Sequence, residues 1–141
     1  MSISVVVCPW SEAQARASAI RFNVFVEEQR VPQELELDEW DAQSWHALAL
    51  REDGTAVATG RLLPDGHIGR MAVLAAARGT GVGAKVLEAL MAKAAALGYE
   101  ALVLNAQTHA APFYARAGFA QVGEEFEEAG IPHVEMRKTL G

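Results

Sequence analysis

The sequence predicts a single α/β domain with a mixed, mostly antiparallel and twisted sheet that is flanked by helices. Strand-like segments at 45–50, 55–63 and 67–74 follow one another through tight turns, which is typical of an antiparallel meander. A helical pattern at 82–97 and a short apolar strand at 101–104 come next. Because the third strand of the meander, this helix and the apolar strand form a β-α-β unit, they predict a right-handed parallel crossover within the sheet.

The N-terminal part of the chain predicts one strand and one long helix. Residues 3–7 are rich in β-branched side chains and predict a strand. Ser11 and Gln14 have the spacing of a capping box, which predicts a helix that runs to about Val26. The acidic segment 33–39 is predicted to be a loop or a short helix.

Turn residues mark the ends of the strands in the meander. Asp53-Gly54 and Pro64-Asp65-Gly66 are turn signals on either side of the middle strand. Gly60 lies inside that strand, where a glycine indicates a bulge or a close approach of another segment. A tolerated small residue is the alternative interpretation of Gly60.

The helix at 82–97 has one apolar face, and Gly98 supplies its stop. A last helix is predicted at 109–117, with a proline in its first turn and a glycine after its end. Two strands at 119–122 and 134–138 then close the sheet, and the glutamate-rich segment 124–128 between them is predicted to be a solvated loop. The apolar face of the first of these helices consists of Val82, Val86, Leu90, Ala94 and Leu97.

Composition restricts the functional classes. Residues 1–141 fit one domain, and 51% hydrophobic with 21% charged residues is typical of a soluble globular protein. The net charge of −6 argues against a nucleic-acid partner, because a polyanion would be repelled. No apolar run approaches the roughly 18 residues of a membrane span. Because residues 1–4 lack the cationic start of a signal peptide, the expected location is the cytoplasm, without a membrane partner.

The stretch from Arg78 to Lys85 has three glycines at alternate positions just before a helix, a pattern that leaves several N–H groups free to bind a phosphate. It is not a nucleoside-triphosphate loop, because Val86 replaces the hydroxyl that would hold magnesium. It formally matches a dinucleotide fingerprint, but the acidic residue that should bind a ribose after the next strand is missing. The remaining form is [QR]-x-x-G-x-[GA], from Arg78, Gly81 and Gly83.

That form resembles the pyrophosphate-binding signature of the GNAT superfamily of N-acyltransferases, which bind acetyl-CoA. Asn105 and the run from Phe113 to Phe119 match the later N…(F/Y)Y-x-x-x-GF pattern of this family. The segments 21–29 and 130–136 are similar to those of a subgroup of small bacterial GNAT proteins, ElaA-like or YjcF-like. The resemblance covers nearly the whole chain and implies a GNAT-like fold with a parallel β-α-β core that binds acetyl-CoA.

The resemblance also implies an acetyl-CoA site, in which a sheet that splays after the third meander strand receives the pantetheine arm. Met71 and Val73 would pair with pantetheine through their main chains, and Arg78 would add positive charge beside the pyrophosphate. The backbone amides of the glycine turn would hold the pyrophosphate. The expected cofactor-binding residues are Met71, Val73, Arg78, Gly79, Thr80, Gly81, Val82, Gly83, Ala84 and Asn105.

Tyr114 stands where the family has a tyrosine that protonates the departing thiolate, so the resemblance implies that it is the general acid. Aromatic packing beside Phe113 is the alternative. Glu28 is the favoured general base, on the expectation that it is an uncompensated carboxylate with a raised pKa, and a solvated or salt-bridged glutamate is the alternative. Gln29 and His133, with Glu28, are expected to bind the acceptor. Asp38, His46 and His133 are the other base candidates, although His46 is better explained as a hydrogen-bonded core or edge residue.

The function that the resemblance implies is direct transfer of an acetyl group from acetyl-CoA to a primary amine of a small molecule, without a metal. A catalytically silent CoA-binding sensor or regulatory module is the alternative, and the phenol of Tyr114 argues against it. Family members are often dimers, so the resemblance allows a homodimer. It does not choose the acceptor amine.

Overall fold

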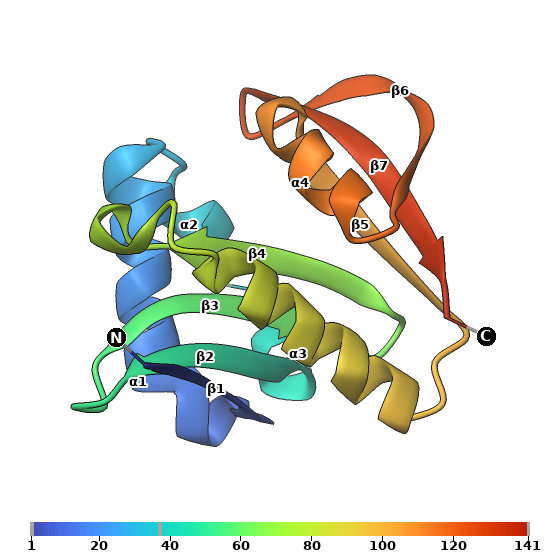
Figure 1. Ribbon diagram of the computed structural model, residues 1–141. Coiled ribbons are helices and arrows are strands. Elements are labelled where there is room, and N and C mark those ends of the chain that lie inside the picture. Colours follow the sequence, from blue (N-terminus) through green and yellow to red (C-terminus); the bar gives the residue numbers. More distant parts are fainter. Residues whose placement is uncertain (1, 37, 141) are drawn as a thin grey trace.

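The computed structural model describes residues 2–36 and 38–140 and contains a seven-stranded mixed sheet in the order β1-β2-β3-β4-β5-β7-β6 (Figure 1). All neighbouring strands are antiparallel except β4 and β5, so the predicted fold class is confirmed. The strands are β1 (Ile3–Pro9), β2 (Trp45–Arg51), β3 (Ala56–Leu62), β4 (His67–Val73), β5 (Ala101–Gln107), β6 (Ala120–Glu128) and β7 (Ile131–Thr139).

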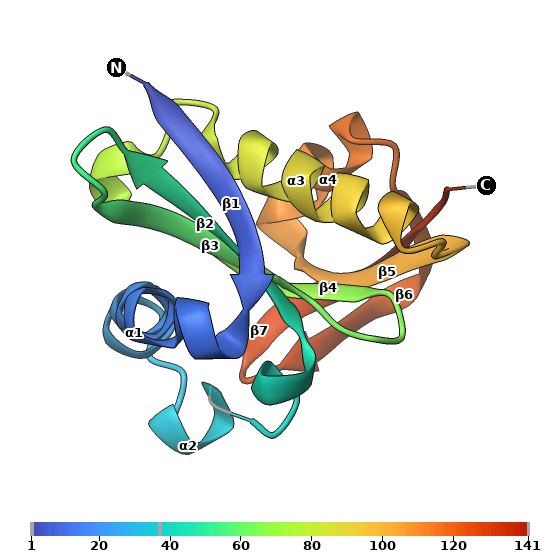
Figure 2. The same cartoon turned by 90° about the horizontal axis from the view of Figure 1, so that it is seen from below.

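Helices cover both faces of the sheet. The α-helices are α1 (Trp10–Arg21), α2 (Gln33–Glu36), α3 (Val82–Ala96) and α4 (Ala111–Arg116), α1 continues directly as the π-helix η1 (Phe22–Glu28), and three short 3₁₀ segments are η2 (Asp41–Gln43), η3 (Ala75–Ala77) and η4 (Thr108–Ala110). Figure 2 shows α1 and α3 on opposite faces of the sheet. Ala13 and Ala17 of α1 pack against Leu48, whereas the neighbouring residues Ala47 and Ala49 point into the core under α3.

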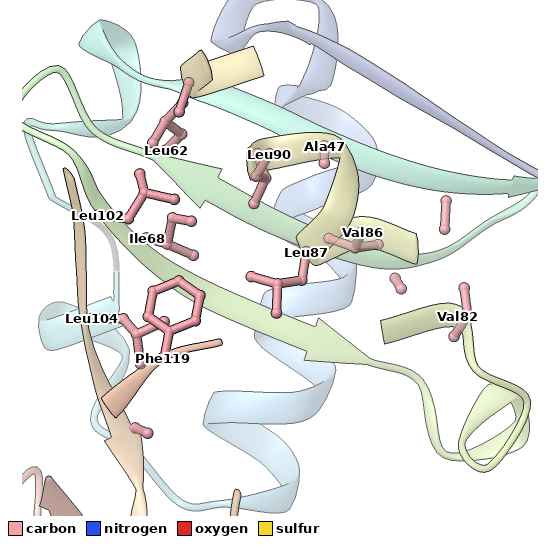
Figure 3. Close-up of a cluster of buried hydrophobic side chains, with 14 of the residues drawn as sticks. Ala47, Leu62, Ile68, Val82, Val86, Leu87, Leu90, Leu102, Leu104 and Phe119 are labelled. Carbon is pink, nitrogen blue, oxygen red and sulfur yellow. The ribbon is translucent and has the colours of Figure 1, made fainter. Parts of the chain in front are cut away.

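The larger core lies between α3 and the sheet. Leu87 and Leu90 of α3 point at Ile68 and at the strands on either side of it, and Phe119 closes the cluster near Leu104 (Figure 3). The predicted apolar face of α3 is confirmed for Val82, Val86, Leu90 and Ala94, which are all buried. It is wrong for Leu97, which is 44% exposed because the helix has already ended at Ala96.

Strand β4 contains a bulge opposite Gly60. Thr59 pairs with Ala72 and Arg61 pairs with Gly69, so β4 has one residue more than β3 between these pairs. Arg70, one of the two β4 residues between these pairs, has a left-handed backbone with φ of 50°. A Cβ atom at Gly60 would lie 2.6 Å from Met71 Sδ and 2.9 Å from a methyl of Leu90. The predicted bulge and the predicted close approach are therefore both present.

The two parts of the sheet separate soon after the parallel pair begins. Only His67 with Val103 and Ile68 with Leu104 are paired between β4 and β5. Beyond Ile68 the two strands diverge, as Figure 1 shows. This splay was expected from the family resemblance, and it leaves the second half of β4 without a strand neighbour on the side of β5.

Two local predictions are wrong. The capping box does not form: α1 begins at Trp10 after Pro9, with no side-chain hydrogen bond at its N-terminus, because β1 runs directly into the helix. The glutamate-rich segment 124–128 is not a loop but the second half of β6, which is turned back to β7 by Ala129 and Gly130, both at positive φ. Exposure of β6 on the sheet edge lets it keep its charged side chains in water, which compensates for their low strand propensity.

The remaining differences are at element ends. β5 continues to Gln107, three residues past the predicted end, and α1 changes to π-helical hydrogen bonding after Arg21. Leu37, within the predicted loop or short helix at 33–39, lies outside the described residues. None of the helices in the described ranges is long and apolar enough to cross a membrane. Among the same residues, no three His, Cys, Asp or Glu side chains are grouped as metal ligands would be.

Candidate active site

The glycine turn lies at the end of β4 and leads directly into α3. Gly79 and Gly81 have φ of 79° and 82°, a left-handed conformation that a side chain would strain. Gly81 is the N-terminal capping residue of α3 and provides no side-chain hydrogen bond, so the first-turn N–H groups of the helix have no intrahelical or side-chain acceptor. The space around Gly79 and Gly81 is open to at least 4 Å. The turn therefore presents uncapped amides to an approaching anion.

Arg78 is held from two directions. Its Nε donates to the Val73 carbonyl oxygen at 3.0 Å, and its two terminal nitrogens donate to the Glu28 carboxylate at 2.6 and 2.7 Å. Hydrogen bonds from Arg78 lower the pKa of Glu28 below its usual value. The expectation of an uncompensated Glu28 with a raised pKa is therefore wrong, because its partner comes from a segment 50 residues away.

The free edge of β4 faces β5 across the splay. The Leu74 N–H donates to the Val57 carbonyl oxygen in β3 at 2.9 Å. Because successive amides of a strand point to opposite edges, the Val73 N–H points to the side of β5. A Cβ atom at Gly83 would lie 3.6 Å from Val73 and 3.5 Å from Phe113. The end of β4, the first turn of α3 and helix α4 therefore meet at one place.

Tyr114 follows Phe113 in α4 and is partly buried between two aromatic rings. It makes edge-to-face contacts with Phe113, at 5.0 Å between ring centroids, and with Phe119, at 6.2 Å. Burial raises the pKa of the Tyr114 phenol to about 12. The hydroxyl makes no hydrogen bond within residues 2–36 and 38–140. Tyr114 is therefore both packed, as the alternative interpretation predicts, and a protonated phenol with an uncommitted hydroxyl near neutral pH.

A second polar group lies on the other face of β5, away from α3. Alternation along β5 buries Leu102, Leu104 and Ala106 under α3, so the intervening Asn105 and Gln107 face the opposite side. Gln107 Nε2 donates to Gln29 Oε1 at 2.8 Å across the splay, and His109 Nε2 donates to Gln107 Oε1 at 2.6 Å. His133 in β7 is the cross-strand partner of Gln107.

The structure thus connects Gln29 and His133 through Gln107, and Glu28 directly precedes Gln29. Asn105 is exposed on this same face rather than on the face that carries the glycine turn. The sequence does not predict Gln107 and His109 as site residues, because the apolar run that predicts the strand ends at Leu104. Continuing the alternation of buried and exposed residues to Gln107 would have found the first of them.

The remaining two base candidates belong to a partly buried ionic network that includes Arg21, the last residue of α1. Asp38 accepts hydrogen bonds from Arg61 at 2.7 Å and from Arg70 at 3.2 Å. His46 is 1% exposed, and its Nε2 donates to the Asp41 carbonyl oxygen at 2.9 Å. Burial lowers the pKa of His46. His46 is therefore the hydrogen-bonded core residue that the sequence favoured, and neither candidate is free to take a proton from a substrate.

The same network fixes the segment before β2. Arg21 is 1% exposed and hydrogen-bonds to Glu36 and to both carboxylate oxygens of Asp41, at 2.7 and 3.2 Å. Arg61 donates to Asp41 at 3.0 Å. Arg70, whose left-handed backbone creates the β4 bulge, donates to the Glu36 carbonyl oxygen at 3.1 Å. The network therefore connects the bulge in β4 to α2 and to the start of η2.

Comparisons with known proteins agree with this geometry. Residues 11–140 match the profile of the acetyltransferase (GNAT) domain family. The chain is 39% identical over 140 residues to the uncharacterised N-acetyltransferase YjcF of Bacillus subtilis, covering 96% of this chain and 99% of that protein. An acyl-CoA N-acyltransferase from Pseudomonas aeruginosa has a similar structure, with a TM-score of 0.86, 32% identity and coverage of 97% and 99% of the two chains. Escherichia coli ElaA also gives a TM-score of 0.86, at 29% identity and the same coverage.

Proposed function

The chain belongs to the GNAT acetyltransferase family, in the subgroup of ElaA and YjcF, and on this premise we propose that it transfers an acetyl group from acetyl-CoA directly to a primary amine of a small molecule. The observation that carries this proposal is the uncapped start of α3 at the point where β4 leaves β5. An anion at such a helix end is favoured by about 0.3–1 kcal/mol from the helix dipole, in addition to its hydrogen bonds.

The pyrophosphate of acetyl-CoA would lie on the amides from Gly79 to Ala84. Its pantetheine arm would then follow the free edge of β4, where the Val73 N–H is available and Met71 lies beside the bulge. Arg78 would approach the phosphates from the side of Glu28. Asn105 lies on the face of β5 opposite α3. It would contact acetyl-CoA only if the molecule extended through the gap between β4 and β5. Supporting this arrangement, Val73, Gly83 and Phe113 already enclose one end of the path.

The reaction would be direct attack of the neutral amine on the thioester carbon. The C–N bond forms, the C–S bond breaks, and the thiolate receives a proton from the Tyr114 hydroxyl. Proton transfer from a phenol of pKa about 12 to a free thiolate whose thiol has a pKa near 8.5 would be unfavourable by roughly 5 kcal/mol. Tyr114 would therefore act as a relay, which gives its proton to sulfur while it receives the surplus proton of the attacking nitrogen.

The acceptor amine would bind on the side of the splay that carries Glu28, Gln29 and His133. Glu28 is a weak candidate for the general base, because its carboxylate is already ion-paired with Arg78. The cluster around Gln107 offers uncharged hydrogen-bonding groups and one buried histidine. These are groups that can orient a small polar amine.

The experiment that tests the proposal is an amine-panel assay that follows release of free thiol from acetyl-CoA. We expect turnover with at least one amine, and a Tyr114→Phe variant that loses about 10²–10⁴-fold in kcat while its calorimetric Kd for CoA stays unchanged. Tyr99→Phe, a partly buried tyrosine outside the site, is the matched control. Equal turnover of wild type and Tyr114→Phe would remove Tyr114 from the mechanism. CoA binding without thiol release for any amine would instead favour the sensor alternative.

A further inference from the structure

We propose that His133 is the general base that deprotonates the acceptor ammonium, and that Glu128 is the counterion of the imidazolium that forms. This inference rests on the proposed function and names the base for that reaction. Four observations carry it: the position of His133, the ring nitrogen that bears its proton, the carboxylate near the other ring nitrogen, and the surroundings of the other candidate bases.

His133 lies on the acceptor side of the splay. It is paired with Gln107 of β5 on one side and with Phe126 of β6 on the other. Since cross-strand partners share a face, its side chain lies beside Gln107, whose amide reaches Gln29 at the end of η1 at 2.8 Å. His133 therefore stands next to the contact that bridges the two parts of the split sheet.

The ring proton of His133 is on Nδ1. Nδ1 lies 2.7 Å from the Ile131 carbonyl oxygen, and a carbonyl oxygen can only accept. The lone pair of the neutral ring is therefore on Nε2. Nε2 makes no hydrogen bond to any residue in 2–36 or 38–140, although the residue as a whole is only 6% exposed. A buried ring with one uncommitted, unprotonated nitrogen is suited to accept a proton from a bound ligand.

Glu128 completes the arrangement. Its Oε2 lies 3.7 Å from His133 Nε2, close enough to stabilise a positive ring but too far for a hydrogen bond to the neutral ring. Phe126, two residues earlier on the same face of β6, stacks on the imidazole with an interplanar angle of 25° and 6.0 Å between centroids. Because the two-residue turn at Ala129-Gly130 fixes the register of β6 and β7, the dyad is part of a rigid hairpin.

The charged and titratable groups around His133 come from four elements. β6 contributes Glu128, and β7 contributes Glu135, which is paired with Arg137 at 2.8 Å. η4 contributes His109, which reaches His133's neighbour Gln107, and η1 contributes Glu28 next to Gln29. Glu28 is compensated by Arg78, so Glu128 is the carboxylate that acts on His133 without a cation of its own within the described residues.

Each of the other candidate bases is either ion-paired, hydrogen-bonded in the core or exposed. Glu28 is ion-paired to Arg78, Asp38 to Arg61 and Arg70, and His46 is buried against the Asp41 carbonyl. His109 donates its Nε2–H to Gln107, which leaves a lone pair on Nδ1, but this residue is exposed in η4 and has no carboxylate partner within the described residues. Among the candidate bases in the described residues, His133 alone combines burial, a lone pair that accepts no hydrogen bond and a nearby carboxylate.

The proton balance follows from these assignments. The acceptor ammonium gives one proton to His133 Nε2 and becomes a neutral amine. The amine forms the C–N bond while the C–S bond breaks, and Tyr114 moves the second nitrogen proton to the sulfur. The products are the acetamide, CoA as its thiol, and the imidazolium, which returns its proton to water through the acceptor side after release of the amide.

The test compares pH profiles of kcat/KM for acetyl transfer from acetyl-CoA to primary alkylamines, from n-propylamine to 1,4-diaminobutane. At pH 7 we expect His133→Gln to lose about 10²-fold or more, because a simple alkylammonium with a pKa near 10.4 must then lose its proton unaided. This deficit should shrink toward pH 10, where the free amine is already present. The Kd for CoA and the urea unfolding midpoint should match those of wild type.

A pair of neighbouring glutamates supplies the control. Glu128→Gln should lower kcat/KM at pH 7 by about 2–5-fold, because the partly exposed carboxylate no longer stabilises the imidazolium as it forms. Glu127→Gln makes the same charge change on the opposite face of β6 and should leave kcat/KM as in wild type. The ¹⁵N spectrum of histidine-labelled wild type supplies a readout that needs no variant, and we expect His133 as the Nδ1–H tautomer at high pH.

Three results would overturn the inference: a constant deficit of His133→Gln from pH 7 to 10, equal profiles for Glu128→Gln and Glu127→Gln, or the Nε2–H tautomer of His133. If wild type transfers acetyl groups and any of these is found, the base is another group and the proposed function stands. If wild type transfers to no amine in the panel, both the base and the proposed function are wrong.

Discussion

Glu28 and Arg78 lie 50 residues apart in the chain and form a two-pronged ion pair, with N–O distances of 2.6 and 2.7 Å. The pair joins the end of η1 to the glycine turn at the start of α3. Arg78 also holds the last carbonyl of β4. Because both side chains are more than 40% exposed, the pair contributes little to folding, but it determines how much of the Arg78 charge is available to a ligand.

The first prediction concerns this ion pair and the affinity for CoA. Glu28→Gln should bind CoA about 2–5-fold more tightly, because Arg78 no longer shares its charge with a carboxylate and an exposed ion pair is worth about 0.2–1 kcal/mol. Isothermal titration calorimetry measures the Kd. Glu27→Gln, with the same charge change at the preceding exposed position, is the control and should bind as wild type does. Weaker binding by Glu28→Gln would show that the carboxylate positions Arg78 instead of competing for it.

The second prediction separates backbone strain from charge at the glycine turn. Gly81 has φ of 82° and open space where a side chain would stand, so Asn and Asp differ there mainly in charge. Gly81→Asp should weaken CoA binding more than 10-fold, since a carboxylate would stand where we propose that the pyrophosphate binds, whereas Gly81→Asn should lose much less affinity. The measurement is again the Kd for CoA. Equal Kd values for wild type and Gly81→Asp would place the pyrophosphate elsewhere.

The third prediction concerns the bulge of β4. Gly60→Ala should destabilise the fold by about 1–3 kcal/mol, because its Cβ would lie 2.6 Å from Met71 Sδ and 2.9 Å from Leu90. Gly69→Ala, in the neighbouring strand with no atom within 4 Å of the new Cβ, is the matched control and should be tolerated. Urea unfolding measures both. If the two variants were equally stable, the contact between Gly60 and Met71 would not be a tight one.

The fourth prediction concerns the buried network and acid pH. Burial alone would raise the pKa of Asp41, but hydrogen bonds and charge from Arg21 and Arg61 outweigh it and the pKa is lowered. The folded pKa is thus below the unfolded value of about 3.9, so the stabilisation is complete above pH 4 and is lost as the pH falls through the folded pKa. Asp41→Asn should cost about 3–5 kcal/mol near neutrality.

Urea unfolding from pH 7 to pH 2.5 measures this effect. Wild type should lose stability more steeply below pH 4 than Asp41→Asn does, because the variant no longer has a carboxylate to protonate at this site. Glu52→Gln, at an exposed position after β2, is the control for charge alone and should follow wild type. Parallel curves for wild type and Asp41→Asn would mean that another carboxylate dominates acid unfolding.

Much of the fold was readable from local patterns. The turns at Gly54 and Gly66, the glycine that ends α3 at Gly98 and the apolar run that begins β5 predicted the meander and the parallel crossover. These patterns are reliable because each depends on residues close in sequence. The prediction failed where burial does not impose a pattern. The exposed glutamates of β6 predict a loop, although pairing with β7 makes this segment a strand.

The candidate site divides in the same way. The spacing of the glycines predicts a phosphate site at the start of α3, and the aromatic pair in the last helix predicts a role for Tyr114, since both are short-range signals. The state of each charged group was not readable, and Glu28 shows why. Its pKa depends on Arg78, a partner that the chain brings near only after η1 and the glycine turn have been positioned by the sheet.

By itself, then, the sequence determined the family and the order of the elements, and it predicted where a phosphate would bind, because these follow from residue type and spacing within a few turns of chain. Only the tertiary structure decided which side chains are free to do chemistry. The hydrogen bond from Gln107 to Gln29 crosses the splay between β4 and β5, and the β6 and β7 hairpin places His133 near Glu128. The physical reason is that the charge and protonation of a side chain depend on neighbours within a few ångströms, and those neighbours come from remote parts of the chain.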